Sequence, residues 1–257
     1  MLTILSPSKT QDFSDNSINV ADLPSSTPAL LNESQKLVKE LRKKSVTDIE
    51  QLMNVSEKIA TLNHERYQHF SVPFTEENAR QALLAFKGDV YTDIAVDEYS
   101  EEEFAFAQDH LRIISGLYGL LRPLDLMQPY RLEMKTPLTN SRGDNLYKFW
   151  GDRISEQLNE ALQTQDTQVL VNLASNEYFK SIDTSQLAGE VVTPVFKEHK
   201  DGKYKVVAIY AKRARGKMTN FIIRNAIDQP EKLKTFTDGG YEFSDSLSSE
   251  KEWVFIR

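Results

Sequence analysis

Three carboxylates lie where the chain is expected to leave a regular element. Asp89 follows a glycine, Glu133 lies in a polar and aromatic run, and Glu177 comes shortly after a predicted strand. Paired carboxylates can divide general acid and base work between them, as they do in glycoside hydrolysis. A glutamate in the first turn of a helix, such as Glu177, more commonly interacts with the helix dipole. The sequence leaves both roles open for Glu177.

A short loop near the N-terminus combines small hydroxyl side chains with a lysine. It reads Ser6-Pro7-Ser8-Lys9-Thr10 and follows the apolar run at residues 2–5. Hydroxyl groups and backbone N–H groups bind oxygen atoms, and a lysine adds positive charge, so the loop suits an anion or a phosphate. The spacing of Ser6 and Lys9 also fits the nucleophile motif of penicillin-recognising enzymes, but the companion motifs are absent. We therefore expect Ser6 and Lys9 to contact an anion.

Positive charge is concentrated in one stretch of an acidic chain. The whole sequence has a formal net charge of −7. Residues 196–224 contain nine basic side chains against two acidic ones, which leaves about −14 on the remainder. Such a stretch is typical of a nucleic-acid footprint, but also of solvated strands whose lysines point outward. The candidates for contact with phosphate are Lys212, Arg213, Arg215 and Lys217.

Two glycines follow a predicted helix and flank an apolar pair. Gly116 and Gly119 with the preceding helix resemble a helix-hairpin-helix element near 101–122, in which exposed backbone N–H groups approach a DNA phosphate. The alternative is a tight turn packed under the core. If the first interpretation holds, Arg122 and Arg131 are further candidates for contact with DNA.

Composition and spacing exclude several kinds of site. The chain has 257 residues, no cysteine and 40% hydrophobic residues, so thiol peroxidases, zinc fingers, iron–sulfur proteins and disulfide scaffolds are excluded. His64 and His69 are five residues apart and do not share a helical face. No Walker or dinucleotide-binding glycine motif is present. We expect no metal and no cofactor.

The apolar runs are too short for a membrane span, and the first residues lack the features of a signal peptide. The expected location is the cytoplasm, without a membrane partner.

Helices predominate in the first half of the sequence. Ser56 is predicted to begin one helix, Thr75 another that runs through Phe86, and Ser100 with Glu103 forms a capping box. In the second half a helix is expected over 145–162 and a strand over 168–173, which leads to Ser175 at the start of a helix.

An Asp-Gly turn is flanked by predicted strands over 191–198 and 204–210. A basic helix is expected next, over 213–228. A final hairpin is predicted to pair residues 241–243 with residues 253–256. The prediction is a mixed α/β (α+β) domain, with a mixed sheet surrounded by helices, over residues 1–257. A full-length strand over 204–210 would place Lys212 at the sheet edge opposite Ser175, which requires either two separate functional surfaces or a strongly curved sheet.

Several motifs together resemble one known family. In order they are LSPSKT at 5–10, AFKGDVY at 85–91, SGLYG at 115–119, RPLDLMQPYRLEM at 122–134, FWG at 149–151, NLASNEYFK at 172–180 and YAKRARG at 210–216. They are similar to the YaaA family of bacterial peroxide-stress proteins, from which Ser8, Lys135 and Asn176 depart. The resemblance implies a cytoplasmic protein that limits oxidative damage by lowering free iron. It also implies a mixed α/β fold, a positively charged cleft and a helix-hairpin-helix element that binds duplex DNA.

The preferred hypothesis is a peroxide-stress protein that binds duplex or distorted DNA, with a small phosphate-bearing ligand as a further candidate partner. The alternative is an enzyme acting on a nucleobase or nucleotide, in which Lys9 holds phosphate and Glu177, Asp89 or Glu133 is the acid or base. A partner-binding protein with an exposed apolar patch is a third class.

Overall fold

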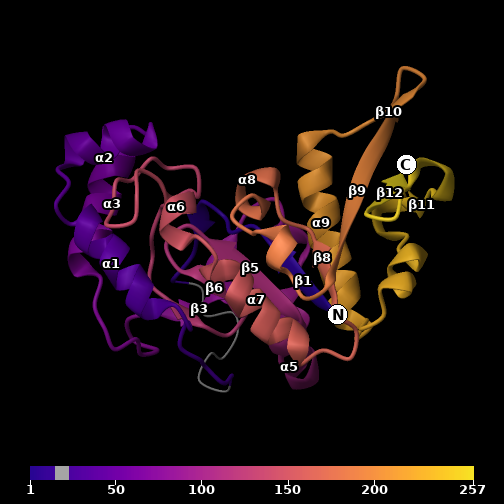
Figure 1. The fold of residues 1–257 in the computed structure, drawn as a ribbon, viewed down its shortest axis with the longest axis horizontal. Coiled ribbons are helices and arrows are strands. Elements are labelled where there is room, and N and C mark those ends of the chain that lie inside the picture. Colours follow the sequence, from indigo (N-terminus) through magenta and orange to yellow (C-terminus); the bar gives the residue numbers. More distant parts are fainter. Residues whose placement is uncertain (15–22) are drawn as a thin grey trace.

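A mixed β-sheet runs through the middle of the molecule (Figure 1). The computed structural model describes residues 1–14 and 23–257. The strands lie in the order β11 (Glu242–Phe243), β12 (Glu252–Ile256), β9 (Glu190–Lys200), β8 (Val169–Asn172), β1 (Leu2–Leu5), β5 (Leu111–Ser115) and β6 (Gly119–Leu121), and β10 (Lys203–Lys205) pairs with β9. The five strands from β12 to β5 are mutually parallel, while β6, β10 and β11 are antiparallel to their neighbours. The predicted mixed α/β class is confirmed.

The central strands are apolar because both faces of the sheet are covered. All four residues of β1 are buried, whereas β9 alternates between buried and less buried positions along its inner part. An uninterrupted apolar run is typical of a parallel strand with helices on both faces. The sheet therefore forms the base on which the loops at the carboxyl ends of β1 and β8 are held.

Three helices form a group at one end of the molecule (Figure 1). They are α1 (Leu31–Leu41), α2 (Val46–Met53) and α3 (Glu57–His69). The expected start of a helix at Ser56 is confirmed. Farther along, the capping box of Ser100 and Glu103 begins α5 (Glu101–His110), because each side chain accepts a hydrogen bond from the other residue's backbone N–H.

The helix predicted from Thr75 through Phe86 is wrong. The chain instead forms β3 (Arg80–Gln81), a single turn α4 (Ala82–Ala85) and β4 (Phe86–Lys87). β3 pairs with β7 (Leu126–Met127), and β4 pairs with β2 (Thr10–Gln11). Tertiary strand pairing outweighs local helix propensity here. The pairing of β2 with β4 brings the loop after β1 close to the segment that carries Asp89.

The predicted helix-hairpin-helix element is also wrong. α5 is followed directly by β5, and Gly116 to Tyr118 form the turn of a buried β-hairpin. A Cβ atom on Gly116 would lie 2.1 Å from the carbonyl oxygen of Leu132, and the Trp150 indole donates to the Gly116 carbonyl at 3.1 Å. The glycine permits close packing of backbone on backbone, and the hairpin does not reach a surface where a DNA phosphate could bind.

The second half of the chain agrees with the sequence in outline. The helix expected over 145–162 is interrupted at Gly151, where φ is 49°, and forms α6 (Leu146–Trp150) and α7 (Arg153–Gln163). Ser175 begins the short helix α8 (Asn176–Phe179), and the last hairpin, β11 with β12, is confirmed.

The strand expected over 204–210 is wrong in length. β10 has only three residues. Because it is so short, α9 (Ala208–Arg224) begins at a level beyond the carboxyl ends of β1 and β8. α9 then runs back beside the sheet (Figure 1). In the described part of the chain no helix is long and apolar enough to span a membrane.

Candidate functional site

A polar pocket of about 420 Å³ lies at the carboxyl ends of β1 and β8. This is the position at which open parallel sheets bind ligands. The pocket, hereafter the strand-end pocket, is lined by the loop after β1, the segment 88–91, Glu133, Lys135, the start of α8 and one face of α9. Its volume falls within the range of small-molecule sites, roughly 300–1,000 Å³.

Two serine hydroxyls join the loops that follow β1 and β8. The backbone N–H of Ser175 donates to Ser6 Oγ at 2.8 Å, and Ser6 Oγ donates to Ser175 Oγ at 3.2 Å. The Tyr91 hydroxyl donates to the Ser6 carbonyl oxygen at 2.9 Å. Ser175 is at the predicted N-cap position, but its side chain does not cap α8. The pair instead fixes the floor of the strand-end pocket.

Glu133 lies among three cations. Its Oε1 is 2.9 Å from Lys9 Nζ and 3.7 Å from Lys135 Nζ, and its Oε2 is 3.4 Å from Arg131 Nη2. Burial by itself would raise the pKa of Glu133, but the hydrogen bond and charge of Lys9, with the charges of Arg131 and Lys135, hold that pKa below its ordinary value. Glu133 is therefore an ionised carboxylate at neutral pH and cannot donate a proton there.

Glu177 contacts the same lysine. Its Oε1 accepts a hydrogen bond from the backbone N–H of Lys135 at 3.3 Å, and its Oε2 lies 3.9 Å from Lys135 Nζ. One ammonium group thus joins Glu133 and Glu177 on the same side of the strand-end pocket. The sequence singled out Lys135 only as a departure from the family pattern and not as a site residue, because it lies in an irregular segment whose path periodicity does not predict.

The start of α9 forms the other side of the strand-end pocket. Lys212 and Arg215 line the pocket, and Lys212 Nζ lies 3.5 Å from Asp89 Oδ2. Residues three apart share one face of a helix. A Cβ atom on Gly216 would lie 2.0 Å from the carbonyl oxygen of Val90, so α9 packs against segment 88–93 without a side chain between them. This close approach brings Lys212 and Arg215 to the pocket.

The neighbouring face of α9 carries cations that are already paired. Arg213 Nε lies 2.8 Å from Asp93 Oδ2, and Lys217 Nζ lies 3.1 Å from Asp93 Oδ1. Burial would raise the pKa of Asp93, but its hydrogen bonds to Arg213 and Lys217 hold it below its usual value. Arg213 and Lys217 therefore attach α9 to the 3₁₀ turn at Tyr91–Asp93 and do not line the pocket.

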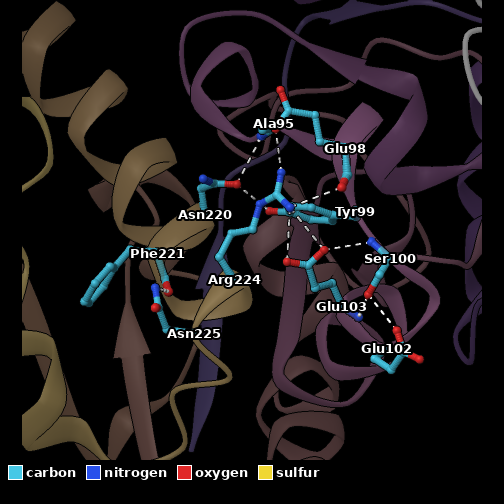
Figure 2. Close-up of polar contacts among 10 residues, drawn as sticks. All are labelled: Ala95, Glu98, Tyr99, Ser100, Glu102, Glu103, Asn220, Phe221, Arg224 and Asn225. Atoms are coloured by element: carbon cyan, nitrogen blue, oxygen red, sulfur yellow. Dashed lines mark hydrogen bonds and ion pairs between the residues drawn. The ribbon is translucent and has the colours of Figure 1, made fainter.

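The far end of α9 is held by a second polar network (Figure 2). Arg224 Nη2 lies 2.8 Å from Glu98 Oε2, its Nη1 lies 3.2 Å from Glu103 Oε1, and its guanidinium stacks over the Tyr99 ring at 5.1 Å. The Asn220 amide oxygen accepts hydrogen bonds from the Ala95 backbone N–H and the Tyr99 hydroxyl. Four of the nine basic side chains in residues 196–224 are thus paired in space with carboxylates from segment 89–103, namely Lys212, Arg213, Lys217 and Arg224.

The pocket brings together some candidates and leaves others out. Those that line it are Ser6, Lys9, Asp89, Glu133, Glu177, Lys212 and Arg215. Arg131 does not line the pocket, but it forms an ion pair with Glu133, which does. Gly116 and Gly119 are buried in the sheet hairpin, and Arg122 forms an ion pair of 2.9 Å with Asp125.

The expectation that Ser175 and Lys212 lie on separate surfaces is wrong, because both line the strand-end pocket. The short β10 is the reason, since it lets α9 return along the carboxyl ends of the strands.

A larger groove of about 1,060 Å³ lies elsewhere, between the start of β9 and the C-terminal segment, and includes Glu190 and Trp253. None of the candidate residues lines it. Within residues 1–14 and 23–257, no group of three or more histidines and carboxylates is placed to hold a metal ion.

Comparison with known proteins assigns the chain to a family. The model of the peroxide stress protein YaaA family matches residues 1–247. A UPF0246 protein of Acaryochloris marina is 54% identical over all 257 residues and the full length of that protein. UPF0246 proteins of Cellvibrio japonicus and Saccharophagus degradans are 50% and 49% identical, over all of this chain and 98% and 99% of theirs. The chain that builds this strand-end pocket therefore belongs to the peroxide stress protein YaaA family.

Proposed function

We propose that this protein contributes to peroxide resistance as an enzyme that acts on a nucleobase or nucleotide, and so limits iron-dependent oxidative damage to nucleic acid. The observation that carries the proposal is the gathering of Asp89, Glu133 and Glu177, from three distant segments, in one pocket with Lys9 and Lys135. Convergent carboxylates with cations in a small cavity are typical of acid–base catalysis.

The two glutamates differ in what they can do. Glu133 is held ionised by Lys9, Arg131 and Lys135, which suits a carboxylate that stabilises positive charge developing on a sugar or base. Glu177 has a more open environment, with 25% of its side chain exposed and Lys135 Nζ at 3.9 Å from its Oε2. We assign the proton transfer to Glu177 and the stabilising role to Glu133.

The experiment is peroxide survival of cells that express Glu177→Gln at the normal protein level. We expect protection to be lost while the melting temperature stays within the range of the parent, because general acid–base catalysis typically contributes about 10²-fold or more to a rate. Glu57→Gln is the matched control, since Glu57 is also a glutamate in the first turn of a helix but is exposed and does not line the pocket. Full protection by Glu177→Gln would reject the catalytic role and leave Glu177 as a helix-dipole partner.

A second candidate function, binding of duplex or distorted DNA, is favoured by the basic arm formed by β9 and β10. This hairpin projects from the body of the molecule beside the start of α9 (Figure 1). Lys203, Tyr204 and Lys205 are exposed on it, and lysines interleaved with an aromatic ring suit phosphates and bases.

The test of this second function is a titration of duplex and mismatched DNA at several salt concentrations. Changing Lys203 and Lys205 together to Glu should reduce affinity and make its dependence on salt less steep. Binding by this double variant equal to that of the parent at every salt concentration would reject DNA contact through the arm.

A further inference from the structure

Most cations that line the strand-end pocket are balanced by carboxylates of the protein. Lys9 pairs with Glu133, Lys135 with Glu133 and Glu177, and Lys212 with Asp89, at the distances given above. These lysines are fixed in place by their partners. An incoming anion would have to compete with those partners for the ammonium groups.

Arg215 differs from these lysines. Among residues 1–14 and 23–257, none places a carboxylate or another hydrogen-bond acceptor on its guanidinium, although the side chain is half-buried and lines the pocket. Burial lowers the pKa of this guanidinium, yet an arginine stays charged at neutral pH. A partly desolvated charge without a partner is unfavourable, and a bound anion would remove that penalty.

The groups around Arg215 favour an oxygen-rich anion. The pocket wall also carries the hydroxyls of Ser8 and Ser175, each of which can donate a hydrogen bond, whereas the Ser6 hydroxyl already donates to Ser175. A guanidinium presents its N–H groups as a planar fork that matches phosphate oxygens in pairs. The lining of the site therefore suits a phosphate at Arg215, in the same pocket as Glu133 and Glu177.

The balance of charge limits how many phosphates the pocket can take. Its described lining has four cationic side chains, Lys9, Lys135, Lys212 and Arg215, against three carboxylates. One positive charge remains in excess, which suits one phosphate group and not a run of backbone phosphates. A polyanion in the same space would face Asp89, Glu133 and Glu177 without enough compensating charge.

We infer that Arg215 is the receptor for a single phosphate group, and that the substrate class of the strand-end pocket is one nucleotide unit, either free or displaced from a nucleic-acid strand. The inference rests on the proposed function, because it takes the same pocket as the site. It adds the residue that selects for phosphate and the number of phosphates bound.

The test is isothermal titration of the full chain with three probes: inorganic phosphate, deoxyadenosine monophosphate and a single-stranded oligonucleotide of about ten residues. Arg215→Met should weaken binding of at least one nucleotide probe about ten- to hundredfold, because a charge-assisted hydrogen-bonded pair is lost. Arg215→Lys should restore part of the affinity, since lysine supplies the positive charge but not the planar pair of N–H donors that a guanidinium presents. Arg224→Met is the matched control and should bind as the parent does.

The salt dependence of the binding affinity measures how many phosphate groups contact Arg215. For the oligonucleotide, the slope of log affinity against log salt concentration should differ between the parent and Arg215→Met by about 0.7, as expected for one phosphate contact on a single strand. An Arg215-dependent signal with the monophosphate identifies a free nucleotide, and one with the oligonucleotide alone identifies a strand; either supports the inference. Binding by Arg215→Met equal to the parent for all three probes would overturn it, as would a difference in slope of three or more.

This titration requires no turnover, so the two proposals fail separately. If Glu177→Gln protects cells fully while Arg215→Met loses phosphate binding, the catalytic function is rejected and the phosphate site stands. If Arg215→Met binds as the parent does while Glu177→Gln loses protection, the phosphate site is rejected and the catalytic role of Glu177 stands.

Discussion

Two arginines of α9 are in opposite situations. Arg224 at the C-terminal end is paired with Glu98 and Glu103 and stacked over Tyr99 (Figure 2), whereas Arg215 in the middle of the helix lines the strand-end pocket. Both belong to the same basic stretch of sequence. The difference teaches that basic residues clustered in sequence divide into structural and ligand-facing groups according to the carboxylates that the fold brings to them.

The largest effect is expected where α9 meets the segment that carries Asp89. Gly216→Val would force a side chain into the space occupied by the Val90 carbonyl group, which has no room to move without separating the helix from the turn. We expect the free energy of unfolding to fall by about 3 kcal/mol, at the upper end of overpacking effects.

Thermal and urea unfolding measure this effect. Ile209→Ala, on the exposed side of the same helix, is the control and should change little. If Gly216→Val unfolds like the parent, the close approach that positions Lys212 and Arg215 is not required for the fold.

Removal of Arg224 should destabilise the protein to a smaller extent. Arg224→Met leaves Glu103, whose side chain is 19% exposed, without its cation. We expect a loss of about 1–2 kcal/mol, since the ion pairs are only partly shielded from water. Phosphate binding should not change. An Arg224→Met variant that keeps full stability but loses phosphate binding would contradict the structural role assigned to Arg224.

The pH dependence of stability tests the ionised state of Glu133. Its folded pKa lies below the ordinary value of 4.5, so its contribution to stability is present above that pH and is lost as the pH falls through the folded pKa. Glu133→Gln should therefore lower stability at pH 7 by about 1 kcal/mol and show a shallower decline on acidification. Unfolding curves at several pH values between about 7 and 3 measure this difference. An equally steep fall in the free energy of unfolding on acidification, for the parent and for Glu133→Gln, would contradict this prediction.

The smallest change in stability is expected at Arg215. Arg215→Met removes a half-buried charge that lacks a partner among the described residues, and the melting temperature should stay the same or rise slightly. Differential scanning calorimetry without added phosphate measures this effect. A loss comparable to that of Arg224→Met would mean that Arg215 supports the fold.

Local sequence signals predicted the elements that depend on local chemistry. The capping box of Ser100 and Glu103, the Asp-Gly turn and the strand leading to Ser175 need only neighbouring residues, and all three are present. The loop at Ser6 and Lys9 was associated with anion binding for the same reason: a strand followed by hydroxyls and a lysine is visible within five residues.

Signals that depend on distant contacts were missed. Gly116 and Gly119 have the spacing of a surface hairpin, but β5 is drawn into the sheet beside β1, and the hairpin is buried with it. Lys135 and Asp93 had no local pattern, since their importance comes from carboxylates and cations on other elements. The length of β10 could not be inferred from its β-rich composition, and that length decides whether Lys212 faces Ser175.

Peroxide survival of cells that express Arg215→Met or Arg224→Met at equal soluble protein levels tests the central claim most directly. We expect Arg215→Met to fail to protect although its melting temperature is unchanged or higher. We expect Arg224→Met to protect although its melting temperature is lower. Full protection by Arg215→Met, with protection lost in Arg224→Met, would contradict the assignment of Arg215 to ligand binding and of Arg224 to the fold.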